Sequence, residues 1–254
     1  MRLYGAGLRQ PPKSCYDDLV GATGAQLVAI GDFDPDALMR EFESLLGDWK
    51  NPAPYKRIPS RFFARDALER TVLTPDKANA VLRGGLNIEL RDDNADFPAM
   101  VLGSYLLGGT SSGRLPMRVR EKEGLSYSTY AYFTAGSLDA AAHFGVSSIY
   151  APQNRDRVEQ AIREELSRAL AQGFSDAEVE EAKKSLLQAR RLARAQDRSL
   201  MARLSNYLYL GRTFAWDIEF ERKIAALTPT DVRDALRRHI DPKKISVLKA
   251  GDFR

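Results

Sequence analysis

The chain has 254 residues, which is enough for one large domain or two small ones. Hydrophobic residues make up 44% and charged residues 28%, a globular composition, and no apolar run approaches the ~20 residues that a membrane-spanning helix needs. The net charge of +4 is a small excess of 38 basic over 34 acidic residues and argues only weakly for nucleic acid, while a single cysteine, Cys15, excludes an internal disulfide and a thiolate metal cluster.

A short sequence recurs near the two ends of the chain. Residues 26–33 read Gln-Leu-Val-Ala-Ile-Gly-Asp-Phe, and residues 246–253 read Ser-Val-Leu-Lys-Ala-Gly-Asp-Phe. Both segments have the pattern of a strand that ends at Gly-Asp-Phe, and their offset of 220 residues is a domain length rather than a solenoid period. We therefore interpret the chain as two copies of one unit, the first present only as its tail and the second complete.

Helix and linker signals set the predicted domain boundaries. Asp34, followed by Pro35, predicts an N-capped helix that ends near Gly47. Residues 51–60 contain three prolines and predict a surface linker. The predicted organisation is a remnant of a preceding homologous domain in residues 1–50, a linker in residues 51–70 and a complete domain in residues 71–254.

The complete domain begins with strand patterns and continues with helix patterns. Strands are predicted at residues 71–73, 80–90, 125–133 and 138–149, the last two as a hairpin, with a returning strand at 245–250. Helices are predicted at residues 96–107, 114–123, 153–170, from 175 towards 210, at 214–227 and at 228–239. Ser175 and Glu178 form a capping box at one of these helix starts. This order predicts an α+β fold with a mainly antiparallel sheet and helices packed on one face.

The stretch from Arg118 to Tyr130 joins the end of a helix to the start of a strand. Gly124 supplies the left-handed conformation that ends a helix without a Cβ penalty, and aromatic and hydroxyl residues follow it, which suits a strand. This junction is expected to bring the side chains of Arg120 and Tyr127 close together. A guanidinium and a phenol both donate hydrogen bonds, which suits a carbonyl oxygen or an oxyanion.

The same stretch carries a family resemblance. Arg-Glu-Lys-x-Gly-Leu-x-Tyr at residues 120–127, preceded by Gly-Gly-x-x-x-x-Arg-Leu at 108–115, resembles the second half of pitrilysin/insulinase-type, processing-peptidase-like zinc metallopeptidases. The resemblance covers the chain from about Val72 to its end, with a further match over the first fifty residues. It implies that Arg120 and Tyr127 contact the substrate backbone near the scissile bond and help to stabilise the tetrahedral intermediate. It also implies a substrate-handling loop that contains Gly108, Gly109 and Gly113.

The zinc motif of these peptidases does not occur in this sequence. Family members bind zinc through His-x-x-Glu-His on a helix and a distant glutamate, whereas this chain has only His143 and His239, 96 residues apart. His143 lies in an alternating strand pattern and is interpreted as a hydrogen-bonded sheet residue. His239 lies in the last turn of a helix, where a positive charge is favourable. We predict no metal site in this chain and expect zinc in the full-length protein.

The resemblance implies a non-catalytic, substrate-binding C-terminal domain of a zinc-dependent endopeptidase that cleaves peptides in an enclosed chamber. This chain would be inactive alone. The implied partners are a peptide or unfolded polypeptide substrate and a zinc-bearing N-terminal half, from the same protein or from a partner subunit, with no nucleic acid and no membrane span. Similar proteins in Gram-negative bacteria are often periplasmic, so the resemblance favours the periplasm over the cytoplasm.

Two other functional classes stay open from the sequence. The parent protein could be a scaffold or assembly subunit that is related to the peptidases but does not hydrolyse peptides. The chain could also bind nucleic acid through a basic run in which Arg190, Arg194 and Arg198 are four residues apart and share a predicted helical face. Acidic residues stand just upstream and no nucleic-acid module is recognised, which favours a solvated helix face or a wall of a peptide chamber.

Overall fold

The computed structural model describes residues 17–254, and these residues form two compact units. The first unit contains the described residues up to Ile58 together with Ala195–Gly211, and the second contains Pro59–Arg194 and Arg212–Arg254. Residues 1–16, which include Cys15 and the beginning of the predicted domain remnant, lie outside the described part of the chain.

The first unit contains the helices α2 (Pro35–Leu46) and α6 (Asp197–Leu210). The predicted cap of α2 is confirmed, because the Asp34 carboxylate accepts hydrogen bonds from the main-chain N–H groups of Asp36 (2.9 Å) and Ala37 (3.0 Å). The predicted strand at residues 26–33 is wrong for this copy, because residues 25–30 form no strand and pair with no other described segment. An extended segment needs a neighbouring strand to complete its main-chain hydrogen bonds.

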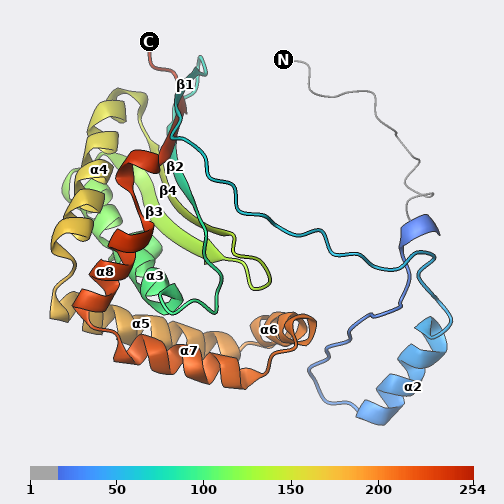
Figure 1. Cartoon of the computed structure of the whole chain (residues 1–254). Coiled ribbons are helices and arrows are strands. Elements are labelled where there is room, and N and C mark those ends of the chain that lie inside the picture. Colours follow the sequence, from blue (N-terminus) through green and yellow to red (C-terminus); the bar gives the residue numbers. More distant parts are fainter. Residues whose placement is uncertain (1–16) are drawn as a thin grey trace. The chain divides into compact units, whose positions relative to one another are not determined.

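The second unit is built on a five-stranded sheet with the order β1-β5-β2-β4-β3 (Figure 1). The strands are β1 (Glu69–Leu73), β2 (Ala80–Ile88), β3 (Ser126–Ala135), β4 (Ala142–Tyr150) and β5 (Ser246–Gly251). The pairs β3–β4, β4–β2 and β2–β5 are antiparallel, while β1 and β5 are parallel. The predicted α+β class with a mainly antiparallel sheet is confirmed, and the parallel edge pair adds a feature that the sequence did not predict.

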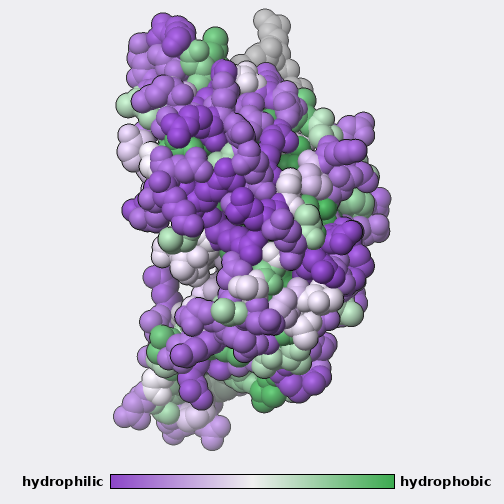
Figure 2. Space-filling model, turned by 90° about the vertical axis from the view of Figure 1, so that its left-hand side faces the viewer, coloured by the Kyte–Doolittle hydropathy of each residue, from purple (hydrophilic) through white to green (hydrophobic). Residues whose placement is uncertain are grey.

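Helices cover one face of this sheet (Figure 1). The covering layer contains α3 (Phe97–Ser104), the π-helices η1 (Tyr105–Gly109) and η2 (Pro116–Lys122), the short η3 (Pro152–Asn154), α4 (Arg155–Gln172), α8 (Pro229–His239) and the short η4 (Pro242–Lys244). The helices α5 (Asp176–Arg194) and α7 (Phe214–Ala226) pack on α3 at the end of this layer. The long helix predicted from Ser175 towards Leu210 is interrupted, because α5 ends at Arg194 and α6 begins at Asp197. The side of the molecule shown in Figure 2 is mainly hydrophilic, which is consistent with solvent-facing helix surfaces there.

The predicted capping box of Ser175 and Glu178 is confirmed, and one further helix start and one helix end have caps of known type. The main-chain N–H of Ser175 donates to the Glu178 carboxylate (2.8 Å), and the N–H of Glu178 donates to the Ser175 hydroxyl (3.3 Å). Thr228 and Asp231 form the same reciprocal pair at the start of α8. Gly173 ends α4 with φ of +72°. These caps satisfy main-chain groups that the helix itself leaves unpaired.

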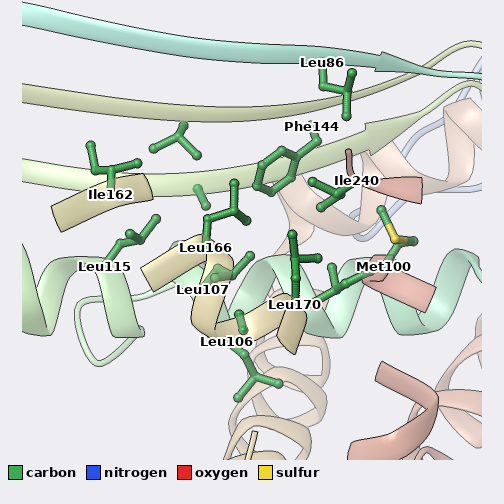
Figure 3. Close-up of a cluster of buried hydrophobic side chains, with 14 of the residues drawn as sticks. Leu86, Met100, Leu106, Leu107, Leu115, Phe144, Ile162, Leu166, Leu170 and Ile240 are labelled. Atoms are coloured by element: carbon green, nitrogen blue, oxygen red, sulfur yellow. The ribbon is translucent and has the colours of Figure 1, made fainter. Parts of the chain in front are cut away.

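The core lies between the covered face of the sheet and the helices (Figure 3). Phe144 projects from β4 into this layer, where Leu166 and Leu170 of α4 and Met100 of α3 also lie (Figure 3). The segment predicted as one helix at residues 96–107 forms α3 and most of η1, and its Met100 and Leu106 are buried in this layer. Burial of this layer holds the sheet in place, and the opposite face of β3 remains available to present side chains.

Candidate functional site

Arg120 lies on η2, a π-helix of seven residues. The N–H of Glu123 donates to the carbonyl of Arg118 (3.0 Å), which is the five-residue spacing of a π-helix. Val119 is fully buried, whereas 53% of the Arg120 side chain is exposed. The sequence predicted a helix here, but its π geometry decides which of the neighbouring side chains faces outwards.

Gly124 ends this helix in the predicted conformation, with φ of +60°. Its N–H donates to the carbonyl of Arg120 (3.1 Å), and the N–H of Leu125 donates to the carbonyl of Val119 (2.8 Å). Leu125 is then buried, with 2% of its surface exposed. The buried anchor after the glycine fixes the path of the chain from the helix of Arg120 into strand β3.

Tyr127 lies at a β-bulge at the start of β3. The register between β3 and β4 shifts between Ser126 and Ser128, so Tyr127 is the additional residue. It is 63% exposed, and its hydroxyl has no hydrogen-bond partner within residues 17–254. The strand is fixed beneath it by a hydroxyl contact of 2.8 Å between Thr129 and Ser148. The bulge therefore presents a phenol to solvent from a rigid strand.

Arg118, two residues before Arg120, has a different environment. Its guanidinium donates to the carboxylates of Glu123 (2.8 Å), Glu164 (2.5 Å) and Glu165 (3.3 Å). The hydrogen bonds to Glu123 and then Glu164 raise the pKa of Arg118 above its ordinary value. Arg120 has only the exposed Glu121 as an ionic partner, at 3.5 Å, in the described part of the chain. Arg118 is therefore a structural residue, and Arg120 is the arginine that can reach a ligand.

The glycines of the 108–113 loop allow close main-chain packing. A Cβ at Gly108 would lie 2.5 Å from the main-chain nitrogen of Ala131 in β3, and a Cβ at Gly113 would lie 2.8 Å from the Cα of Gly108. Gly109 is exposed. The loop thus lies directly on β3, and a role of Gly108, Gly109 and Gly113 in handling substrate stays a prediction.

Strand β3 carries two further exposed tyrosines that the sequence argument did not select. Tyr130 and Tyr132 are 39% and 37% exposed, and their rings lie 6.1 Å apart between centroids. Arg83 of β2 donates a hydrogen bond of 2.8 Å to the Tyr130 hydroxyl. The signal was present in the sequence, because Tyr130 and Tyr132 alternate with the buried Ala131 and so share the open face of the sheet.

The two histidines lie in separate polar environments. His143 contacts Asn87 through Nδ1 at 3.3 Å, and burial lowers the pKa of His143, which confirms its interpretation as a hydrogen-bonded sheet residue. His239, at the end of α8, contacts Asp96 through Nε2 at 2.8 Å. Residues 17–254 contain no group of three His, Cys, Asp or Glu side chains that could hold a metal ion. The described residues therefore do not fit the zinc site that the resemblance associates with this type of peptidase.

Ion pairs hold the basic run of α5 against α7. Arg190 donates to Asp217 and, at 2.9 Å, to Glu221, and Arg194 also pairs with Glu221. Arg198 lies on α6 in the other unit, so the predicted shared face of Arg190, Arg194 and Arg198 is wrong. The signal for the pairing was the four-residue spacing of Asp217 and Glu221 in the sequence. These contacts give the arginines a structural role and leave the nucleic-acid hypothesis without its binding face.

The fold and this site define a domain of the zinc-metallopeptidase type whose described residues carry no metal ligands. A family model described as the peptidase M16 inactive domain matches residues 13–186. The chain belongs to this family and is its pitrilysin-like C-terminal, inactive domain.

Two curated relatives and two solved structures illustrate the match. The chain is 31% identical over 236 residues to an uncharacterized zinc protease of Streptomyces coelicolor, covering 90% of this chain and 50% of that protein. It is 22% identical over 216 residues to a non-peptidase homolog of Helicobacter pylori, covering 85% of this chain and 49% of that protein. The chain therefore spans about half the length of these relatives.

The solved structures share the fold. A peptidase M16 inactive domain from Pseudomonas fluorescens aligns with a TM-score of 0.73 at 21% identity, covering 86% of this chain and 50% of that chain. The periplasmic protease PqqL of Escherichia coli aligns with a TM-score of 0.67 at 17% identity, covering 87% of this chain and 24% of that chain. Among the described helices, none combines the length and the apolar character that crossing a membrane requires.

Proposed function

We propose that this domain binds peptide substrate for a zinc-dependent endopeptidase that cleaves peptides in an enclosed chamber, and that it is inactive alone. The observation that carries the proposal is the exposure of Arg120 and Tyr127 on two elements joined by Gly124 and Leu125. Both side chains are more than half exposed, whereas the neighbouring Arg118 is held by three carboxylates. Two exposed donors on rigid elements suit recognition of a ligand that carries oxygen acceptors.

The chemistry of the pair suits a peptide undergoing cleavage. The Arg120 guanidinium offers a planar fork of N–H donors, and the Tyr127 hydroxyl offers one further donor. Donors held in place before the reaction stabilise negative charge that develops on a carbonyl oxygen, because they need no reorganisation in the transition state. Strand β3 is also the edge of the sheet, so an extended peptide could pair with its main chain, a mode that tolerates different substrate sequences.

The loop with Gly108, Gly109 and Gly113 belongs to the same proposal. It packs on the β3 main chain and leads into η2, the helix of Arg120. A movement of the loop would therefore shift the positions of both elements that carry the pair. Of the three glycines, Gly109 is the exposed one and is the one that a peptide could contact directly.

The remaining components would come from outside the described residues. In this proposal a homologous N-terminal half, from the same protein or from a partner subunit, provides the zinc and its ligands. The zinc would activate water as a Lewis acid. The coverage of about half of each curated relative supports such an arrangement. The structural likeness to a periplasmic protease supports the periplasm as the compartment.

The proposal is tested by Tyr127→Phe in the protein combined with its zinc-bearing half. Loss of one donor to an oxyanion is expected to lower kcat by ~10²–10³-fold with little change in KM. Arg120→Lys, which keeps the charge and loses the fork, is expected to give an intermediate loss.

Tyr209→Phe is the matched control, because Tyr209 is also exposed and its hydroxyl only contacts that of Tyr55 at 3.4 Å. The control is expected to keep wild-type kinetics. Wild-type kinetics for Tyr127→Phe, with unchanged thermal stability, would refute the proposed role of the pair.

A scaffold subunit without hydrolytic activity is the second candidate function. The observation in its favour is the likeness to a Helicobacter pylori protein described as a non-peptidase homolog. The two candidates are separated by the zinc-bearing half: an intact His-x-x-Glu-His there, with peptide hydrolysis by the combined protein, excludes the scaffold.

A further inference from the structure

A cleft of about 1500 Å³ opens in the second unit, where β5 begins. Its walls are formed by residues 62–67, the end of β2, the C-terminal end of α4 and the connection from α8 to β5. Neither Arg120 nor Tyr127 lines this cleft. It is therefore a site distinct from the pair on which the proposed function rests.

The strand β2 has a free edge at this cleft. β5 pairs with β2 only as far as the partners Ser246 and Gly85, whereas β4 continues to pair with β2 as far as Ile88 and Ala142. Residues 86–88 consequently have a strand neighbour on one side only within the described chain. An unpaired strand edge offers main-chain donors and acceptors to another extended segment.

Apolar side chains form part of the lining. Leu86, Leu170 and Ile240 line the cleft, and all three are less than 10% exposed and belong to the hydrophobic core. Figure 3 shows them converging from β2, α4 and the end of α8. Because the core supports these side chains from behind, this wall of the cleft has a fixed shape that can receive a ligand without refolding.

The charged lining is positive in balance. Five cationic side chains line the cleft (Arg65, Arg237, Arg238, Lys243 and Lys244), against three carboxylates (Asp66, Glu89 and Asp241). Among the residues that the structure describes, Arg237, Lys243 and Lys244 have no ion-pair partner. Arg238 is committed to Asp96, with contacts of 2.9 and 2.6 Å. Three cations on one wall are thus available to an acidic ligand.

We propose that this cleft is a docking site for an acidic peptide segment, bound in an extended conformation alongside residues 86–88 of β2. The edge of β2 would form hydrogen bonds with the peptide main chain, and the apolar lining would contact aliphatic side chains of the peptide. Side chains alternate along an extended peptide, so the carboxylates between them would pair with Arg237, Lys243 and Lys244. A nucleic acid fits less well, because it offers no extended peptide main chain to the edge of residues 86–88 and no aliphatic side chains to the apolar lining.

The test measures binding of a fluorescein-labelled peptide of about ten residues with alternating Glu and Val to the 254-residue chain, by fluorescence anisotropy. The double variant Lys243→Glu/Lys244→Glu is expected to weaken binding by at least about tenfold. Lys184→Glu/Arg191→Glu is the matched control. Both residues are exposed on α5, and their substitution reverses the same number of charges away from the cleft. The control is expected to bind within about twofold of wild type.

A second peptide tests the main-chain contact independently of charge. The same sequence with alternate backbone amides N-methylated on the edge-facing side keeps every carboxylate but loses strand pairing, and is expected to bind at least about tenfold more weakly. Lys243→Glu/Lys244→Glu is expected to weaken binding of the first peptide whether or not Arg120 and Tyr127 contact substrate, because neither of those two residues lines the cleft, and this separates the site from the proposed function.

Several outcomes would overturn the proposal. Equal weakening by the cleft variant and the control variant would show non-specific attraction by net charge. Equal binding of a Lys-and-Val peptide would remove the acidic preference, and tighter binding of a single-stranded oligonucleotide that is lost in Lys243→Glu/Lys244→Glu would assign the cleft to nucleic acid. Equal binding of the N-methylated peptide would remove the strand pairing.

Discussion

Arg118 and Arg120 show how two identical side chains on one helix acquire different roles. Both occur in the run Arg-Val-Arg-Glu-Lys-Glu, and either arginine could form a local ion pair with the glutamates that follow. In the structure Arg118 forms ion pairs with carboxylates on α4, whereas the Arg120 side chain is largely exposed. The family resemblance selected Arg120, whose contact with substrate stays a prediction and whose side chain is exposed in the structure. The residues alone could not, because the π-helical geometry sets which side chain turns inwards.

This difference predicts effects of different size for two matched substitutions on stability. Arg118→Met removes the cation from Glu165, which is only 4% exposed, so its carboxylate loses a partner and keeps only Arg168 at 3.1 Å. The free energy of unfolding is expected to fall by about 1–3 kcal/mol. Arg120→Met is expected to change it by less than about 0.5 kcal/mol, as for an ordinary surface substitution. Urea denaturation measures both values.

Arg168→Met is the informative companion variant, because it removes the other cation near Glu165 from a more exposed position. It is expected to cost less than Arg118→Met. Equal stability of the Arg118 and Arg120 variants would contradict the assignment of Arg118 as the structural arginine.

At the scale of elements, the features that the sequence predicted best are those set by neighbours in the chain. The Ser175 and Thr228 capping boxes and the Asp34 cap depend on residues two or three positions apart, so a local pattern contains all the needed information. The π-helix η2 packs against α4, which is distant in the sequence, and the break between α5 and α6 falls at Ala195-Gln196, without a glycine or proline. No local pattern at Arg194 or Pro116 specified them.

One of these caps is predicted to act as a pH-dependent stabiliser. The Arg114 guanidinium, which donates two hydrogen bonds to Glu178 (2.7 and 2.9 Å), lowers the pKa of that carboxyl from 4.5 to about 2, with further help from Ser175. Arg114 is itself held over the Phe174 ring at 4.4 Å. Because the folded-state pKa lies below the unfolded value, the contribution of Glu178 is fully present above pH 4.5 and is lost as the pH falls towards 2.

Thermal unfolding of wild type and Glu178→Gln across this range measures the effect. The wild type is expected to have the higher Tm at neutral pH, and the difference is expected to shrink as the pH falls below 4.5. Glu219→Gln is a suitable control, since Glu219 pairs with Arg222 on the exposed face of α7 and its contribution to stability is screened by solvent. A Tm difference for Glu178→Gln that stays constant with pH would show that the cap acts by shape rather than by charge.

At the scale of the whole molecule, the sequence predicted the class of fold but not the complete sheet order. Strand periodicity identified all five strands, and the order of strands, then helices, then a returning strand indicated one covered face. The parallel pairing of β1 with β5 joins Glu69 to Val247, segments at opposite ends of the domain, and no local signal encodes such a contact. The cleft beside β2 was missed for the same reason. It depends on β5 beginning at Ser246, opposite Gly85, so that β5 does not pair with residues 86–88 of β2.

The repeated segment at residues 26–33 gives the prediction that belongs to this largest scale. Its counterpart in the second unit, β5, pairs with both β1 and β2, whereas residues 25–30 have no strand partner in the described chain. The curated relatives are about twice as long as the matched region. If the segment is the last strand of a preceding homologous domain, it becomes a paired strand when the sequence of that domain is present.

Hydrogen exchange monitored by mass spectrometry tests this expectation. It compares the 254-residue chain alone with a longer form that also contains the homologous N-terminal half. The amides of residues 27–30 are expected to exchange at least about tenfold more slowly in the longer form, because strand pairing protects main-chain N–H groups from solvent. The amides of β5 serve as an internal reference, since they are paired in the second unit in both forms. Unchanged exchange at residues 27–30, with β5 protected as before and the N-terminal half folded, would mean that the two Gly-Asp-Phe segments are not equivalent strands and that the domain duplication does not hold.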